Sequence, residues 1–197
     1  MIFVTSKTSD GNMDFRFGEY KKVLENRKKF FNKLGVKNIV EVKQIHDNNV
    51  VLIENIVDPD TAADGMVTNH NIYLMLRIAD CIPIGLYDPT HQALGLVHAG
   101  SKGLEKSIIK NVLNQMKKNF KTNPKDLIVN FGPSIGPCHY KMDLWTEAEK
   151  QLSEYGVLEK NIDNPKICTY ESKDYFSHRR SQDFKTEGGR FVTILGF

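Results

Sequence analysis

Three short apolar runs in the middle of the chain constrain its fold more than any other feature. They cover residues 72–76, 82–87 and 93–98, and Asp, Pro or Gly residues bound them. Apolar runs of this length between turn residues are typical of buried β-strands. Because these strands follow one another without intervening helices, the pattern is unlike a regular strand–helix alternation and predicts an α+β fold.

Helical periodicity flanks this strand-rich centre. Apolar spacings of three and four predict a helix over 20–34. A second helix opens at 100–103 and continues to Phe120, since an apolar residue recurs at every fourth position. A third helix is expected over 144–155. Further strands are predicted over 2–5, 39–46, 50–53 (as the return strand after Asn48-Asn49), 127–131 and 191–195, with another turn at Asp64-Gly65.

Length and composition indicate one globular domain spanning residues 1–197. The 197 residues are 40% hydrophobic and 26% charged, which suits a chain that buries a core and excludes a disordered one. The net charge of +3 is too small to indicate a nucleic-acid partner. No run approaches the ~20 apolar residues of a membrane-spanning helix. We therefore expect no nucleic-acid and no membrane partner.

The cysteines indicate a reducing compartment. Cys81, Cys138 and Cys168 are odd in number and widely spaced, unlike a disulfide framework. The first residues carry no basic segment followed by an apolar run, so no signal peptide is visible. The sequence predicts a soluble, cytoplasmic protein in which a free cysteine is buried, binds a metal or acts as a nucleophile.

Reactive side chains lie at the ends of three predicted strands. Gln44 and His46 close one strand, Cys81 precedes another and His98 ends a third. Their wide separation excludes a finger-type zinc site with local ligand pairs, whereas two His and one Cys leave a fourth coordination position open, as in catalytic zinc sites. The alternative is a buried cysteine beside hydrogen-bonded histidines. Asp80 has three possible roles: it orients a metal ligand, it carries a proton, or it is a turn residue.

Ordered motifs from about residue 26 to residue 195 carry a resemblance to a known family. The chain resembles the laccase-domain family, also called multicopper polyphenol oxidoreductase-like, whose members act as purine nucleoside phosphorylases. The matching motifs are Gln44-x-His46, Ala63-Asp64-Gly65-x-Val67-Thr68, Ala79-Asp80-Cys81-x-Pro83, His98-Ala99-Gly100-x-x-Gly103, Gly132-Pro133-x-Ile135-Gly136-Pro137-Cys138-x-Tyr140, Cys168-Thr169, Phe176-Ser177-x-Arg179-Arg180 and Gly189-Arg190.

The resemblance implies a fold, a metal and a reaction. It implies layered mixed β-sheets flanked by helices, Zn²⁺ bound by the family's His, Cys and His, and phosphorolysis of adenosine, inosine and methylthioadenosine with phosphate as co-substrate. It also implies deamination of adenosine. The metal ligands fall on His46, Cys81 and His98; Asp80 and Cys81 are the catalytic candidates, and Gln44, Asp64, Lys7, Lys102 and Arg179 the substrate-binding ones. The oligomeric state is left open.

The chain departs from the family pattern at two cations. The segment after His98 usually reads Gly-Trp-Arg-Gly but is Gly100-Ser101-Lys102-Gly103 here, and Lys7 replaces an Arg near the N-terminus. Lysine lacks the bidentate fork that arginine offers to phosphate, so we expect weaker phosphorolysis or a changed substrate if these residues hold phosphate. Ser134 and His139 stand where many relatives have Cys.

Three other functions remain open. The first is a cysteine hydrolase with Cys81 as nucleophile and His98 as base. The second is a polyphenol oxidase that uses Cu²⁺, which six His residues without clustered His-x-His pairs disfavour. The third is a divergent family member that binds metal without phosphorylase activity. A second metal site at Cys138, His139 and Cys168 is a weaker candidate, because adjacent strand residues point to opposite faces.

Overall fold

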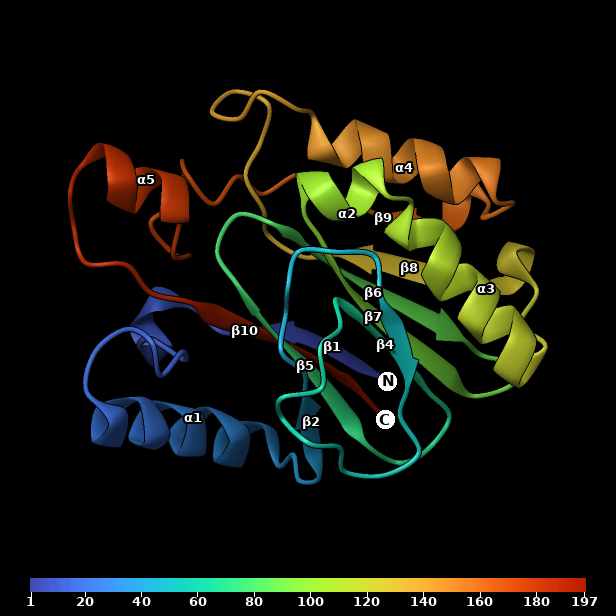
Figure 1. The fold of residues 1–197 in the computed structure, drawn as a ribbon, viewed down its shortest axis with the longest axis horizontal. Coiled ribbons are helices and arrows are strands. Elements are labelled where there is room, and N and C mark those ends of the chain that lie inside the picture. The colour runs from blue at the N-terminus through green and yellow to red at the C-terminus, as the bar shows by residue number, and fades with distance from the viewer.

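Two mixed β-sheets lie face to face between helices in the computed structural model, which describes residues 1–197 (Figure 1). One sheet has four strands in the order β1 (Ile2–Thr5), β10 (Phe191–Gly196), β5 (Tyr73–Ile78) and β2 (Ile39–Glu41). The other has six strands in the order β3 (Val50–Leu52), β4 (Gly65–Thr68), β7 (Ala93–Ala99), β6 (Ile82–Asp88), β8 (Ile128–Phe131) and β9 (Ile162–Asp163).

Helices lie on the outer sides of both sheets and at one end of the molecule (Figure 1). They are α1 (Tyr20–Leu34), α2 (Ser101–Glu105), α3 (Ile108–Phe120), α4 (Leu144–Glu154) and α5 (His178–Asp183), with short 3₁₀ helices at Thr8–Asp10, Pro124–Asp126 and Glu159–Asn161. In Figure 1, α1 lies on the side of the four-stranded sheet, and α2, α3 and α4 lie on the side of the six-stranded sheet. The parallel pairs β2–β5, β3–β4 and β8–β9 make both sheets mixed.

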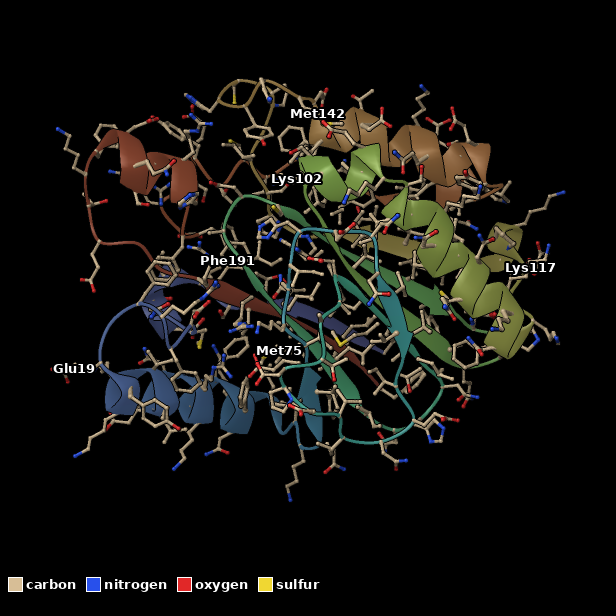
Figure 2. All side chains as sticks on the ribbon, in the orientation of Figure 1. Glu19, Met75, Lys102, Lys117, Met142 and Phe191 are labelled. Carbon is tan, nitrogen blue, oxygen red and sulfur yellow. The ribbon has the colours of Figure 1, made fainter.

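Strand alternation distributes the side chains among three apolar layers. In β5, Leu74 and Leu76 face the other sheet, whereas Met75 packs in the cluster on the α1 side. In β10, Phe191 likewise faces the other sheet, and Val192 packs in the cluster on the α1 side. Figure 2 shows Met75 and Phe191 within the molecule and Glu19 and Lys117 at its edges. Burying an aliphatic or aromatic side chain contributes about 1.5–3 kcal/mol, so these layers hold the sheets and helices together.

The α+β fold class and the layered arrangement are confirmed. The central strands and the helices at α1 and α4 form close to their predicted bounds. No helix of the structure has both the length and the apolar character that a membrane span requires.

The region after β2 differs from the prediction. The strand expected over 39–46 ends at Glu41, and β3 does not return beside it. Instead β3 pairs in parallel with β4 in the other sheet. The chain therefore crosses from one sheet to the other between β2 and β3. Asp64-Gly65 is not a surface turn either, because Asp64 is fully buried and Gly65 begins β4.

The helix predicted from 100–103 to Phe120 is two helices. It breaks at Lys106 and Ser107, where Ser107 has a φ of +61°. The Asn48 side-chain amide donates to the Lys106 carbonyl at 2.7 Å, and the Lys106 ammonium lies 2.9 Å from Asp47. The loop that follows His46 therefore supplies polar partners at this break. Apolar periodicity gave no sign of the break because Leu104 and Ile108 are both buried.

Candidate metal centre and adjoining cavity

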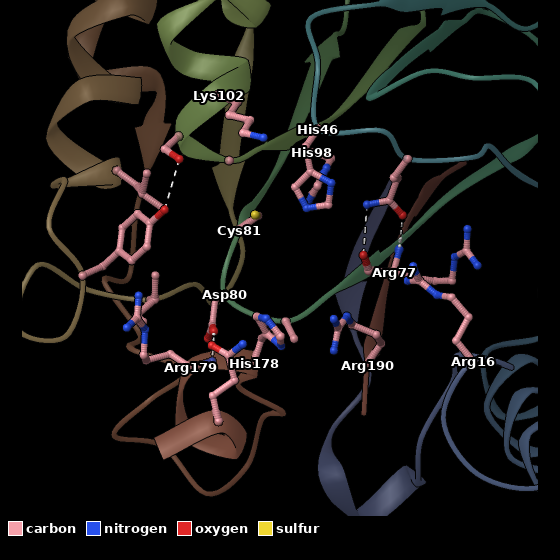
Figure 3. Close-up of a pocket in the computed structure, with 18 residues that line it drawn as sticks. Arg16, His46, Arg77, Asp80, Cys81, His98, Lys102, His178, Arg179 and Arg190 are labelled. Carbon is pink, nitrogen blue, oxygen red and sulfur yellow. Dashed lines mark hydrogen bonds between the residues drawn. The ribbon is translucent and has the colours of Figure 1, made fainter. Parts of the chain in front are cut away.

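Three separate segments bring His46, Cys81 and His98 together, and we call these residues the cavity cluster. One donor atom from each lies within 4.8 Å of the others. In β7, His98 is on the same face of the sheet as Leu94 and Leu96, which face the opposite sheet. Cys81 directly precedes β6. The two imidazole rings are 4.8 Å apart and nearly perpendicular (Figure 3). The sequence prediction that these side chains meet therefore agrees with the structure.

The buried Asp64 carboxylate organises the cluster from behind. It accepts backbone N–H groups from Ile45, His46 and Asp47 at 3.1, 3.0 and 2.8 Å, and it lies 2.7 Å from His98 Nδ1. Burial alone would raise the pKa of Asp64, but the hydrogen bonds from His98 and the Asp47 backbone lower it. Three N–H groups that point at one carboxylate explain why the strand does not reach His46, which has a φ of +59°.

Asp64 occupies Nδ1 of His98, so Nε2 is the nitrogen that meets the Cys81 sulfur, and a metal ion would displace the proton that these two atoms share. Burial alone would raise the pKa of Cys81, but the charge of His98 and hydrogen bonds with both histidines lower it below its ordinary value. Burial opposes protonation of His98, whereas the Cys81 thiolate and Asp64 favour it and raise its pKa.

The donor set fits a metal ion. Two imidazoles and one thiolate are ligands that zinc and copper both accept, and three protein ligands leave one position of a tetrahedron open. A Cβ added to Gly100 would lie 2.8 Å from Cys81 Sγ, so the glycine keeps the space around the thiolate clear. The cluster therefore combines donors, charge and room for an ion.

A cavity of about 360 Å³ opens beside the cluster. Its size is in the range of small-molecule sites. Figure 3 shows Arg16, Arg77 and Arg190 together on one side of the cavity and Lys102 and Arg179 on other parts of its wall. Five cations around one cavity give it a positive potential that favours an anionic ligand.

Arg77 is held at the cavity through both its backbone and its side chain. Its backbone N–H donates to Gln44 Oε1 at 2.9 Å, and the Gln44 amide donates to the Arg77 carbonyl at 3.0 Å. Its guanidinium lies 3.4 Å from Glu41 and 3.9 Å from the buried Asp14. Gln44 thus fixes the end of β5, and the two carboxylates hold the Arg77 side chain at the cavity.

Arg190 has no carboxylate within 4.0 Å of its guanidinium. Burial and the charge of Arg16 lower the pKa of Arg190, and its guanidinium lies over the Phe17 ring at 4.6 Å. Lys102 and Arg179 also lack a carboxylate partner. Because a partly buried charge is costly without an opposite charge, Arg190 favours the binding of an anion from solution, whereas Lys102 and Arg179 are exposed and add positive charge at the cavity wall.

Asp80 connects the cluster to the loops around α5. It has a φ of +88°, and it directly precedes Cys81. One of its carboxylate oxygens accepts the Thr169 hydroxyl at 2.7 Å, and the other accepts the Arg179 backbone N–H at 2.7 Å. Both oxygens are therefore engaged by protein donors, and the left-handed backbone holds the residue in a strained conformation.

The structure divides the substrate-binding candidates into two groups. Gln44, Lys102 and Arg179 line the cavity, as do the catalytic candidates Asp80 and Cys81. Two candidates do not line it: Asp64 lies behind His98, and Lys7 forms an exposed ion pair with Asp174 at 2.8 Å.

Sequence reasoning missed part of the cavity wall. Arg16 and Arg77 were not identified, and Arg190 and Tyr140 entered only as letters of motifs. Each stands alone in its segment, so no local spacing marks it. Signals were present only in two motifs: Gly189-Arg190, which directly precedes the last strand, and the motif that ends at Tyr140.

Comparison with known proteins extends these observations. The family model described as multi-copper polyphenol oxidoreductase laccase matches residues 4–143 and 139–197. The purine nucleoside phosphorylase YlmD of Bacillus subtilis (strain 168) is 31% identical over 68% of this chain. The chain spans 59% of the length of that protein. A purine nucleoside phosphorylase of Clostridium acetobutylicum is 30% identical, and the match covers 95% of this chain and 84% of the relative.

A solved structure agrees with the fold. The crystal structure of YlmD from Geobacillus stearothermophilus superposes with a TM-score of 0.87 at 23% identity, covering 98% of this chain and 90% of that one. The matches to the family model span nearly the whole sequence, including every residue of the cavity cluster. The resemblance found in the motifs is thereby confirmed, and the chain belongs to the multi-copper polyphenol oxidoreductase laccase family.

Proposed function

We propose that the chain is a zinc-dependent enzyme that acts on purine nucleosides. Its reactions are phosphorolysis of adenosine, inosine and methylthioadenosine and deamination of adenosine. The observation that carries the proposal is the position of a two-histidine, one-cysteine donor set at the wall of a cavity that also holds cations without carboxylate partners. The names of the relatives, purine nucleoside phosphorylases, support the same reaction class.

His46, Cys81 and His98 would hold the metal. We favour zinc over copper because a thiolate with two imidazoles and one open position matches the ligand sets of catalytic zinc sites. Bound zinc supplies Lewis-acid chemistry at the cavity wall. Asp64 orients His98 through Nδ1 and fixes the His46 backbone, so the donors are in place before any ion arrives.

Arg190, with Arg77 and Arg16, would bind the phosphate. Arginine forks hold phosphate oxygens in a fixed orientation, and that orientation directs one oxygen at the anomeric carbon of the ribose. In phosphorolysis the new bond forms between this oxygen and the anomeric carbon while the bond to the purine nitrogen breaks. The cations also stabilise the charge of the phosphate dianion.

The opposite wall would accommodate the nucleoside. Ile135, Tyr140 and Leu144 provide apolar and aromatic surface for a purine ring. The Tyr140 hydroxyl lies 3.1 Å from the Ser101 hydroxyl, which fixes the ring at the cavity edge. Because both oxygens of Asp80 already accept hydrogen bonds, we assign Asp80 to positioning Arg179 and the start of β6 rather than to carrying a proton.

One observation favours a second candidate, a cysteine hydrolase. The pKa of Cys81 is lowered beside His98, which is the property of a nucleophilic thiolate with a neighbouring base. In that enzyme the thiolate attacks a carbonyl carbon and His98 returns the proton to the leaving group. Such a reaction requires the thiolate to be free of metal, so activity would rise on chelation.

Chromatography of nucleoside reactions tests both candidates. Zinc-loaded protein is incubated with adenosine, inosine and methylthioadenosine, with and without phosphate, beside Cys81→Ala and the exposed-histidine control His70→Asn. Free base that appears only with phosphate, and is lost in Cys81→Ala but not in His70→Asn, supports phosphorolysis. Inosine from adenosine without phosphate supports deamination alone. Absence of turnover in protein that retains its zinc contradicts the proposal and supports a divergent, non-phosphorylase member.

A further inference from the structure

Two loops outside the cavity cluster bring four metal-binding side chains together. Cys138 and His139 lie on the loop between β8 and α4, and Cys168 and Glu171 lie on the segment between β9 and α5. Donor atoms of Cys138, His139 and Glu171 lie within 4.8 Å of one another, and Cys168 Sγ is 3.8 Å from Cys138 Sγ. We call these four residues the loop cluster.

The sulfur spacing matches a metal site. Two Zn–S bonds of about 2.3 Å at a tetrahedral angle place their sulfurs about 3.8 Å apart. The free thiols Cys138 and Cys168 already have this separation. His139 Nε2 and Glu171 Oε1 are in hydrogen-bond contact with each other, and Cys168 approaches the group through Cys138, so a bound ion requires these side chains to turn toward one point.

The backbone holds the two loops in register without any ion. The Ser134 N–H donates to the Ile167 carbonyl at 3.1 Å, and the Thr169 N–H donates to the Ser134 carbonyl at 2.9 Å. The Gly136 N–H donates to Cys168 Sγ at 3.3 Å, which fixes the position of this sulfur. The His139 ring stacks on Tyr170 at 3.7 Å between centroids, which limits its rotation.

The expectation that the Cys138 and His139 side chains point to opposite faces is wrong, because these residues do not lie on a strand. Adjacent residues diverge on a strand, but Cys138 and His139 lie in a turn that follows Gly136, where the His139 N–H donates to the Gly136 carbonyl at 3.2 Å. In that turn both side chains reach the same segment, Cys138 toward Cys168 and His139 toward Glu171.

We propose that Cys138, His139, Cys168 and Glu171 bind a second zinc ion, with a structural role. Four protein ligands leave no open position, which is the arrangement of a structural site. The ion joins two loops that both contact Asp80. The Ile135 N–H donates to the Asp80 carbonyl at 2.8 Å, and the Thr169 hydroxyl donates to the Asp80 carboxylate. The second site thereby stabilises the cavity wall beside Cys81.

Metal counting tests the second site apart from the proposed function, because it does not depend on turnover. The full chain is loaded with Zn²⁺ under reducing conditions, freed of excess ion and analysed by elemental mass spectrometry. We expect about two equivalents of zinc per chain in the wild type and in His70→Asn, and about one in Cys81→Ala and in Cys138→Ser. The variant that combines Cys81→Ala with Cys138→Ser should bind none. Cys81→Ala that binds no zinc, or Cys138→Ser that retains as much zinc as the wild type, overturns the proposal.

Cobalt provides a second measurement that reports on ligand type. In the Cys81→Ala background, Co²⁺ at the loop cluster is bonded to two thiolates and gives a thiolate-to-cobalt charge-transfer band in the near ultraviolet. We expect Cys168→Ser to reduce this band and Glu171→Gln to weaken Co²⁺ binding while the band per bound ion is retained. A thiol titration that finds Cys138 and Cys168 joined as a disulfide in reduced, zinc-loaded protein overturns the proposal, as does absence of the band.

Discussion

The cavity cluster and the loop cluster use similar donors on different supports. In the cavity cluster, the fully buried Asp64 holds His98 and the backbone around His46. In the loop cluster, backbone hydrogen bonds between two loops hold the ligands, and the Glu171 side chain is 64% exposed. The difference shows that a buried carboxylate makes donor geometry part of the core, whereas the loop cluster depends on the ion to complete its support.

Removing one carboxylate from each cluster sharpens this comparison most. We expect Asp64→Ala to destabilise the metal-free protein by about 3–5 kcal/mol, because it leaves buried N–H groups and His98 without their partner. Glu171→Ala removes an exposed partner and costs about 0–1 kcal/mol. Urea unfolding in the presence of a chelator measures both values. Equal losses would show that Asp64 is not the organising group.

The clusters also differ in their relation to the anion site. We expect Arg190→Gln to lower kcat/KM for phosphate by about 10–100-fold, because a charged hydrogen bond contributes about 1.5–3 kcal/mol. Glu171→Gln serves as the matched change away from the arginines and should leave KM for phosphate unaltered. Initial rates at varied phosphate give both constants. A similar effect of the two substitutions would break the comparison.

Chelation separates the clusters by access. Two ligands of the loop cluster, Cys138 and Glu171, are exposed to a chelator from solvent, whereas the cavity cluster has one exposed ligand, His46, and a buried one, His98. Zinc-loaded protein mixed with a coloured chelator is expected to release metal in two phases of about one equivalent each. Cys138→Ser should remove the fast phase and Cys81→Ala the slow one. Loss of the slow phase in Cys138→Ser would reverse the assignment.

The smallest effect concerns the two lysines that replace family arginines. Lys102 lines the cavity, whereas Lys7 pairs with Asp174 away from it. We expect Lys102→Arg to lower KM for phosphate about two- to fivefold, in line with a solvent-accessible ion pair. Lys7→Arg is the matched control and should have no effect on KM. A change of KM in Lys7→Arg alone would contradict the placement of these residues.

The sequence was most informative where one strand carries its own signal. Leu74, Leu76 and Leu94 belong to apolar runs whose length and boundaries indicate strands, and these strands form the sheets. His46, Cys81 and His98 were found because each stands near the end of such a run. Family motifs then added the expectation that the three side chains converge, which spacing alone does not establish.

Long-range partners explain what the sequence did not predict. Asp64 resembles a turn residue because its side-chain partners, His98 and the backbone at His46, are distant in sequence. Arg77 on β5 and Arg190, which directly precedes the neighbouring β10, line one cavity although they are far apart along the chain. The break before α3 likewise depends on Asn48, which binds there from another loop. None of these features leaves a local pattern.

The chain crosses between the two sheets at residues 79–81, between the end of β5 and the start of β6. Arg77 and Arg190 belong to the four-stranded layer, whereas Cys81 and His98 belong to the six-stranded layer. The cavity is therefore assembled from two separable halves. Substitutions at Arg77 or Arg190 change its charge while the donors in the other layer keep their own supports.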